Sequence, residues 1–158
     1  IGMWLRAWYL VMLRHPCGVE LYKASEAGVQ IDLIVRGICC LIPNQPYSRN
    51  IRITRIVDGF LEHARVWYFH HGGKELVFFG SPDWMRRNLY RRIEAVTPVL
   101  DQALKEEMLE MLRIQLTDNQ KAAWVDEHLC NVLKKQTDVK PIRAQKDFYQ
   151  YLHKKNLP

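Results

Sequence analysis

Residues 19–36, VELYKASEAGVQIDLIVR, decide the fold of this chain. The first half, Val19–Ala27, has apolar residues at helical spacing, and Gly28 is a natural stop because glycine adopts the left-handed conformation that ends many helices. The second half, Val29–Val35, is a nearly continuous apolar run, which is typical of a strand buried on both faces of a parallel sheet. A helix, a glycine and a buried strand in this order are half of an α/β unit, so we predict an α/β fold.

Four further segments have the patterns of strands. Alternating or mostly apolar runs predict strands over residues 51–57, 63–69, 75–79 and 93–99. Gly72 and Gly73 are expected to form a hairpin turn between the second and the third of them. Asp58 is a candidate cap for a short helical turn up to Glu62, and Gly80–Leu89 is expected to be a loop.

The last third of the chain is predicted to be helical. Helical patterns are found over residues 101–116, 117–133 and 141–155. We therefore divide one domain into an atypical N-terminal segment (residues 1–19), an α/β core (residues 20–100) and a helical C-terminal part (residues 101–158). The predicted architecture is a mixed sheet flanked by helices, with a helical C-terminal region.

Composition predicts a soluble globular protein. The chain has 158 residues, 48% of them hydrophobic and 25% charged, which suits one domain with a sizeable core. No run approaches the roughly 18 apolar residues that a membrane-spanning helix needs, so at most a peripheral membrane contact is expected. The chain does not begin with Met, which suggests a fragment. The four cysteines lack the spacing of zinc ligands, so we predict buried free thiols in a reducing cytoplasm and no metal site.

The excess positive charge lies in one central segment. Residues 36–92 carry nine Arg and one Lys against four acidic residues, whereas the remainder of the chain carries thirteen basic and thirteen acidic residues. Arginine makes planar, bidentate contacts with phosphate, whereas a merely solvated basic face could use lysine equally well. The segment therefore predicts a phosphate-rich ligand. The alternative is that these arginines are surface residues paired with scattered acids.

His63 is the candidate catalytic residue of this segment. On the predicted strand His63 and Arg65 share one face, about 6.5 Å apart along the chain. The hairpin would bring Gly80, Ser81 and Asp83 back towards them. An imidazole beside a guanidinium and a hydroxyl suits phosphoryl chemistry, with the histidine as nucleophile or acid/base and its neighbours as ligands of the phosphate oxygens. Asp83 could orient His63, hold an arginine or cap the following turn.

The spacing resembles the phospholipase D signature, which is His-x-Lys followed by Asp and then by Gly-Ser-x-Asn. Arg65 replaces the lysine, Asp83 replaces the asparagine, and the position of the first Asp falls near His70. Four longer stretches resemble the last domain of bacterial type 1 polyphosphate kinases: LYKASEAGV (21–29), IDLIVRGICCL (31–41), FLEHAR (60–65) and GSPDWMRRNLYRRIE (80–94). The resemblance covers about Glu20 to the C-terminus, and residues 1–19 do not share it.

The resemblance implies a phospholipase D-like fold and a cytoplasmic enzyme that transfers the terminal phosphate of ATP reversibly to polyphosphate, with Mg²⁺ accompanying the ATP. It implies that Arg36 contacts ATP phosphate, that His63 is an acid/base partner in the active site, and that the phosphorylated histidine belongs to an upstream domain. Further candidates for binding substrate are Arg65, Ser81, Arg87 and Arg91, the last two on one face at helical spacing. The expected partners are ATP or ADP, polyphosphate, the upstream domains of the same enzyme, and further copies in a homo-oligomer.

Two other functions stay open. A phosphodiesterase of the phospholipase D type would use His63 itself as the nucleophile, and it would need a dimer because such enzymes use two histidine motifs. A non-enzymatic nucleic-acid binder is suggested by the sequence pI near 9.2. The chain has no recognisable RNA-binding motif, however, so nucleic acid is not an expected partner.

Overall fold

The stretch from helix to strand around Gly28 has the predicted structure. Helix α1 (Cys17–Glu26) leads through Gly28 into strand β2 (Gln30–Val35). Gly28 has a φ of 91°, in the left-handed region that glycine adopts without strain. Its N–H donates to the carbonyl oxygen of Ser25 at 3.0 Å and closes the last turn of the helix. The glycine therefore ends α1 and directs the chain into the sheet.

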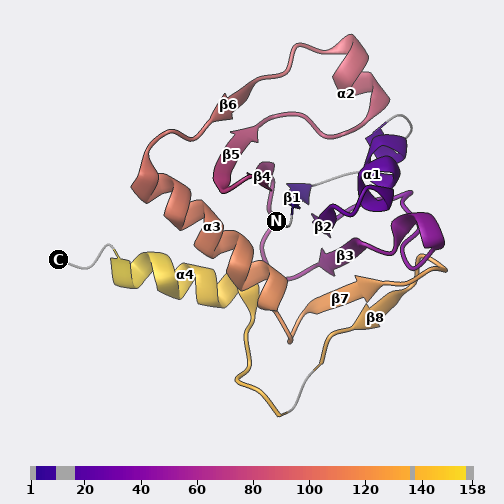
Figure 1. Cartoon of the computed structure of the whole chain (residues 1–158). Helices are drawn as coiled ribbons and strands as arrows, with labels where there is room; N and C mark the ends of the chain where they lie inside the picture. The colour runs from indigo at the N-terminus through magenta and orange to yellow at the C-terminus, as the bar shows by residue number, and fades with distance from the viewer. Residues whose placement is uncertain (1–2, 10–16, 136–137, 156–158) are drawn as a thin grey trace.

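The computed structural model describes residues 3–9, 17–135 and 138–155, and these residues form one mixed sheet of eight strands (Figure 1). The strands are β1 (Trp4–Tyr9), β2, β3 (Ile51–Ile56), β4 (Val66–His71), β5 (Lys74–Gly80), β6 (Val96–Pro98), β7 (Ala122–Val125) and β8 (Asn131–Leu133). Their order across the sheet is β6-β5-β4-β1-β2-β3-β7-β8. Strands β1, β2 and β3 are parallel, and β4 and β7 flank them in antiparallel orientation. The predicted α/β class is confirmed.

Helices cover both faces of the sheet. They are α1, α2 (Arg86–Arg91), α3 (Gln102–Thr117) and α4 (Ala144–Lys155), with a short 3-10 turn, η1 (Pro46–Ser48). On β2, Leu33 belongs to an apolar core that includes Leu21 of α1. The next residue, Ile34, belongs to a second core that includes Leu112 of α3. Since neighbouring residues of a strand point to opposite faces, the two cores lie on the two sides of the sheet, and Figure 1 shows α1 on one side with α3 and α4 on the other.

The C-terminal part is not wholly helical as predicted. Helices α3 and α4 form, but the segment over residues 117–133 contains the hairpin of β7 and β8 instead of a helix. Strand β7 pairs with the edge of β3, with Trp124 opposite Thr54. The prediction was wrong because a four-residue strand is stabilised mainly by its neighbours, and its own sequence gives only a weak preference.

The segment before β4 also differs from the prediction. Strand β4 begins at Val66 and not at His63, so residues 57–65, named here the His63 segment, form neither helix nor strand. The helical turn predicted after Asp58 is absent from this segment. Helix α2 replaces part of the predicted loop over residues 80–89, and β6 is shorter than the strand predicted over residues 93–99.

Part of the atypical N-terminal segment is an integral part of the sheet. Strand β1 lies between β2 and β4, parallel to the first and antiparallel to the second. Residues 1–2 and 10–16 of the predicted segment lie outside the described residues. Within the described ranges, the chain has no helix with the length and apolar character needed to cross a membrane.

The cysteines agree only in part with the prediction. All four are described and free, but Cys39 alone is buried, whereas Cys40 and Cys130 are exposed. Cys39 and Cys40 are neighbours in the chain, and only one of the two side chains reaches the core. Burial raises the pKa of the Cys39 thiol, which keeps it protonated and unreactive at neutral pH.

Candidate functional site

Arg36 follows β2 directly, at the edge of the sheet where open α/β folds bind ligands. Its Nη1 donates a hydrogen bond to the carbonyl oxygen of Glu62 at 2.7 Å. Because His63 comes next in the chain, this bond places the guanidinium beside the candidate catalytic histidine. The position of Arg36 at the strand end is as the sequence predicts, and its role stays a prediction.

Arg65 also bonds to the backbone of the His63 segment. Its Nη1 donates to the carbonyl oxygen of His63 at 2.7 Å, and its Nε donates to Oδ1 of Asp83 at 3.2 Å. The side chains of Arg65 and Asp83 are 18% and 10% exposed, so the ion pair is largely shielded from water. Asp83 therefore holds an arginine, which is one of the three roles that the sequence left open. Any orientation of His63 by Asp83 acts through Arg65.

The side chain of His63 is exposed. The prediction that His63 and Arg65 share one face of a strand is wrong, because both residues precede β4. The structure nevertheless brings them together, since Arg36 and Arg65 bind consecutive carbonyl oxygens of the His63 segment, those of Glu62 and His63. Two arginines bound to the backbone on which an exposed histidine is carried are an arrangement suited to binding phosphate near an acid/base group.

Ser81 joins the turn that contains Asp83 to residues 94 and 95 by hydrogen bonds. Its Oγ donates to a carboxylate oxygen of Glu94 and accepts from the N–H of Ala95 at 3.2 Å. Gly80 lies so close to the segment before β6 that a Cβ atom there would stand 2.4 Å from the carbonyl oxygen of Ala95. A side chain at position 80 would therefore displace the backbone. The hydroxyl of Ser81 already has two partners, which gives it a structural role beside the site.

The other two predicted ligands of phosphate lie on α2. Arg87 and Arg91 are both within this six-residue helix, so their helical spacing is as expected. Arg91 is exposed, whereas the side chain of Arg87 lies outside what the structure describes. The structure therefore leaves Arg91 accessible to an anionic ligand.

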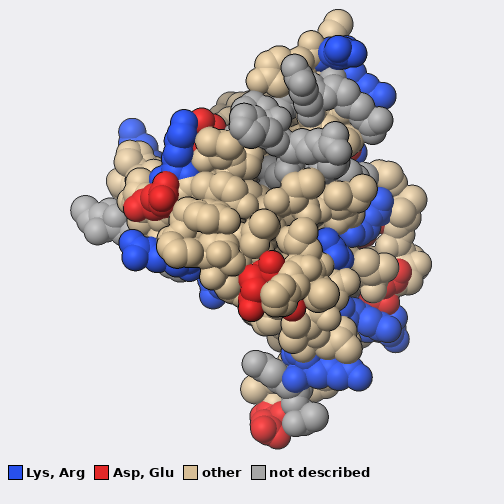
Figure 2. Space-filling view, turned by 90° about the vertical axis from the view of Figure 1, so that its right-hand side faces the viewer, with Lys and Arg blue, Asp and Glu red and all other residues tan. Residues whose placement is uncertain are grey.

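Some of the central arginines have structural partners instead. Nε of Arg52 donates to Oδ1 of Asp32 at 2.8 Å, and Arg55 donates to Asn131 Oδ1 at 2.8 Å. On the face drawn in Figure 2, Lys and Arg lie in separate patches with Asp and Glu between them. The alternative of arginines paired with acids thus holds for Arg52 and also for Arg65, which is paired with Asp83, but not for Arg55. Arg65 nevertheless joins Arg36 at the backbone of the His63 segment.

A pocket of about 470 Å³ adjoins Arg36. It is lined by Arg36, residues 56–62 and Gln145 of α4. Burial raises the pKa of Glu62, opposed by a hydrogen bond with Gln145 and by the charge of Arg36. The pKa of Asp58 is lowered, chiefly by its hydrogen bonds with Arg143. The pocket thus combines one arginine with two carboxylates, of which Asp58 is paired with Arg143.

Sequence reasoning missed the contribution of α4 to this site. Arg143 and Gln145 contact the His63 segment, but they lie more than eighty residues away from it in the chain. Asp58 was singled out only as a helix cap. No local pattern marks a residue whose partner is so distant.

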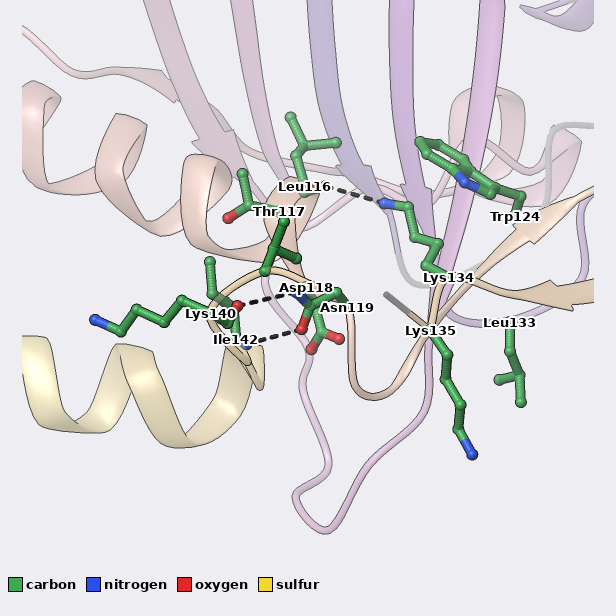
Figure 3. A pocket seen from close by; sticks show the side chains of 11 residues that line it. Leu116, Thr117, Asp118, Asn119, Trp124, Leu133, Lys134, Lys135, Lys140 and Ile142 are labelled. Atoms are coloured by element: carbon green, nitrogen blue, oxygen red, sulfur yellow. Dashed lines mark hydrogen bonds between the residues drawn. The ribbon is translucent and has the colours of Figure 1, made fainter. Parts of the chain in front are cut away.

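A second pocket, of about 590 Å³, lies between the β7–β8 hairpin and the end of α3 (Figure 3). Lys134 points into this region, where its Nζ donates to the carbonyl oxygen of Leu116 at 3.0 Å. The same Nζ lies 3.7 Å from the centroid of the Trp124 ring. Burial lowers the pKa of Lys134 from 10.5 to about 8. Sequence reasoning missed this site because it predicted a helix over residues 117–133.

We expect Lys134 to make stability rise with pH between about 8 and 10.5. Over this range the folded chain has lost the proton that the unfolded chain still holds, so each further increase in pH favours the folded state. Because the side chain is only partly buried, solvent screening reduces the effect to about 1 kcal/mol. Urea unfolding of wild type and Lys134→Met across this range measures it, with Lys135→Met as the exposed control. Parallel pH profiles for wild type and Lys134→Met would contradict the expectation.

A metal site of protein ligands is not evident in the described residues. Among residues 3–9, 17–135 and 138–155, no three His, Cys, Asp or Glu side chains are grouped so that they could hold a metal ion. Asp58 in the His63 segment and Asp83 beside it are each paired with an arginine. The described residues therefore do not fit a divalent ion held by the protein alone.

The fold defines a class, that of phospholipase D-like domains. Nuc from Salmonella typhimurium, a phospholipase D family member, has a TM-score of 0.54 with this chain and is 16% identical, over 72% of this chain and 77% of Nuc. At this level of identity the likeness concerns the fold alone.

Within this class, the chain belongs to the family described as polyphosphate kinase C-terminal domain 2, whose model matches residues 17–145. The polyphosphate kinase of Halalkalibacterium halodurans is 46% identical over 136 residues, 85% of this chain, and that of Synechocystis is 56% identical over 103 residues, 65% of this chain. The crystal structure of polyphosphate kinase from Porphyromonas gingivalis is 54% identical, with a TM-score of 0.94 over 98% of this chain. The resemblance found in the sequence is confirmed.

The chain is much shorter than these relatives. It spans 19% of the H. halodurans protein, 14% of the Synechocystis protein and 24% of the chain in the P. gingivalis structure. Family membership is thus shown for a segment of the length of this chain, and it does not by itself assign to this chain the activity of the longer proteins.

Proposed function

We propose that this chain is a catalytic domain of a polyphosphate kinase, which transfers the terminal phosphate of ATP reversibly to polyphosphate. The observation that carries the proposal is the meeting of Arg36 and Arg65 at consecutive backbone carbonyl groups, those of Glu62 and of the exposed His63. Guanidinium groups bind phosphate without reading any sequence, and an exposed imidazole is accessible for proton transfer. Membership of the polyphosphate kinase family supports this assignment.

The transfer proceeds in two steps. A histidine of an upstream domain attacks the γ-phosphorus of ATP, the bond to the β–γ bridging oxygen breaks, and ADP leaves. A terminal oxygen of polyphosphate then attacks the phosphohistidine, the P–N bond breaks, and the polymer is one phosphate longer. In this scheme Arg36 and Arg65 bind the phosphate oxygens, Arg87 and Arg91 extend the basic surface, and His63 exchanges a proton with the transferring group.

Magnesium enters this proposal only with the nucleotide. Mg²⁺ bound to ATP neutralises phosphate charge, and the described residues of this chain offer no cluster to hold it independently. The site is completed by upstream domains of the same polypeptide, and we propose a cytoplasmic homo-oligomer as the working form. The greater length of the relatives supports the presence of further domains.

An assay of polyphosphate formation from labelled ATP tests the proposal on this chain and on the full-length protein, in which the chain is joined to its upstream domains. We expect polyphosphate and ADP from the full-length protein and neither from the chain alone. Synthesis by the isolated chain would contradict an upstream phosphohistidine. A full-length protein that forms no polyphosphate from ATP would contradict the function itself.

A further inference from the structure

We propose that Gln145 and the ion pair of Arg143 with Asp58 are a clamp that positions the His63 segment for phosphate transfer. The inference rests on the proposed function, because it assigns positioning residues to the same site. The clamp acts through the backbone next to His63 and Arg36. It is distinct from the arginines proposed to bind phosphate.

The His63 segment needs such a support. Its nine residues lie between β3 and β4 without forming helix or strand, so the sheet holds only its ends. The large apolar side chains of the segment do not anchor it either, since Val57, Phe60 and Leu61 are 64%, 69% and 75% exposed. Polar contacts must therefore fix its conformation.

Gln145 binds the middle of the segment with both ends of its amide. The N–H of Phe60 donates to Oε1 of Gln145 at 2.8 Å, and Nε2 of Gln145 donates to the carbonyl oxygen of Phe60 at 2.8 Å. Gln145 is only 7% exposed, so water does not compete freely for these bonds. The side-chain amide thus replaces the neighbouring strand that Phe60 lacks. An amide offers a donor and an acceptor side by side, whereas an ionised carboxylate offers acceptors alone.

The ion pair fixes the beginning of the segment. Arg143 donates to Asp58 through two nitrogens, with Nε to Oδ2 at 2.8 Å and Nη2 to Oδ1 at 2.6 Å. The side chain of Asp58 is 3% exposed, and its Oδ1 also accepts from the N–H of Gly59. A two-point contact of this kind restricts orientation as well as distance.

The start of α4 is itself held in place. The N–H of Ala144 donates to Oδ2 of the buried Asp118 at 2.7 Å, and the N–H of Arg143 donates to Oδ2 of Asp147 at 2.6 Å. Gln145 and Arg143 therefore lie at a helix end whose position is itself fixed by hydrogen bonds. Two residues beyond Phe60, the carbonyl group of Glu62 accepts the bond from Arg36. Loss of the bonds from Gln145 to Phe60 would therefore let the carbonyl group of Glu62, which binds Arg36, move together with the imidazole of His63.

Steady-state kinetics of the full-length protein test the clamp, with temperatures chosen at which circular dichroism shows each variant to be fully folded. For Gln145→Ala we expect kcat for polyphosphate synthesis to fall about tenfold and KM for ATP to rise a few fold, because misplaced groups lose their effective concentration. Gln145→Glu keeps the size and the acceptor but loses the donor, and it should show the same losses. Gln150→Ala, at an exposed position of α4, is the matched control and should change neither value.

A double-mutant cycle with His63→Ala separates positioning from simple loss of structure. If Gln145 acts through the His63 segment, Gln145→Ala should reduce kcat much less than tenfold when His63 is already absent. Equal effects in both backgrounds, or unchanged kcat and KM in the folded Gln145 variants, would overturn the clamp. A wild-type protein without polyphosphate synthesis would instead refute the proposed function, so the two failures are distinguishable.

Discussion

Replacing His63 by Ala in the full-length protein is expected to lower polyphosphate synthesis from ATP by about 100-fold or more, the usual contribution of a positioned acid/base group. The substitution removes the imidazole but not the local structure, since the contacts from Arg36 and Arg65 go to backbone carbonyl oxygens that alanine retains in place. The side chain is exposed, so the loss of packing is small. The effect would therefore report on chemistry and not on folding.

Initial rates with saturating ATP measure this effect, and His71→Ala is the matched control. His71 is also an exposed histidine, at the end of β4, but it lies at the hairpin and away from the arginines. We expect it to leave the rate within about twofold of wild type. Undiminished synthesis by His63→Ala would contradict a catalytic role. Labelled phosphate trapped on His63 in the isolated chain would favour the alternative of a phosphodiesterase with His63 as nucleophile.

Replacing Asp118 by Ala is expected to lower the free energy of unfolding by about 4 kcal/mol, among the largest effects of a single substitution. Asp118 is 1% exposed, and its carboxylate accepts from four backbone N–H groups. Three of these donors, in residues 120–122, lead into β7, and the fourth is in Ala144 at the start of α4. Alanine would leave the four donors without this acceptor, and two of them, those of Ala122 and Ala144, are in buried hydrogen bonds, where an unpaired donor is costly.

Urea unfolding of the chain measures this loss, with Asp118→Asn as the control. Asparagine fits the same space and keeps one acceptor oxygen, so it should cost about half as much. A loss of less than about 1 kcal/mol for Asp118→Ala would show that water or local rearrangement satisfies the four donors. The carboxylate of Asp118 would then contribute little to the stability of β7 and of the start of α4.

The elements that the sequence predicts correctly are those whose own residues determine them. Gly28 ends α1 because its φ is positive, and Gly72 and Gly73 turn the hairpin with φ values of 56° and 80°. Asp101 begins α3 by accepting from the N–H of Leu104 at 2.9 Å, as an N-cap residue does. In each case the physical cause lies within a few residues of the effect.

The errors concern elements whose partners are distant in the chain. The edge of β3 stabilises β7 as a strand, and α4 holds the His63 segment in an irregular conformation. By contrast, the position of Arg36 could be predicted, because it follows from the buried strand directly before it. The pairing of Asp83 with Arg65 was one of several possibilities, and only the fold selects among them.

The position of β1 has a practical consequence for any shortened form of this protein. The match to the family model starts at residue 17, after β1, although β1 lies between β2 and β4. A piece expressed from residue 17 onward would contain two strands with unpaired edges at the middle of the sheet. Such edges pair readily with other chains and lead to aggregation. Recombinant fragments should therefore start ahead of Trp4 if they are to be monodisperse.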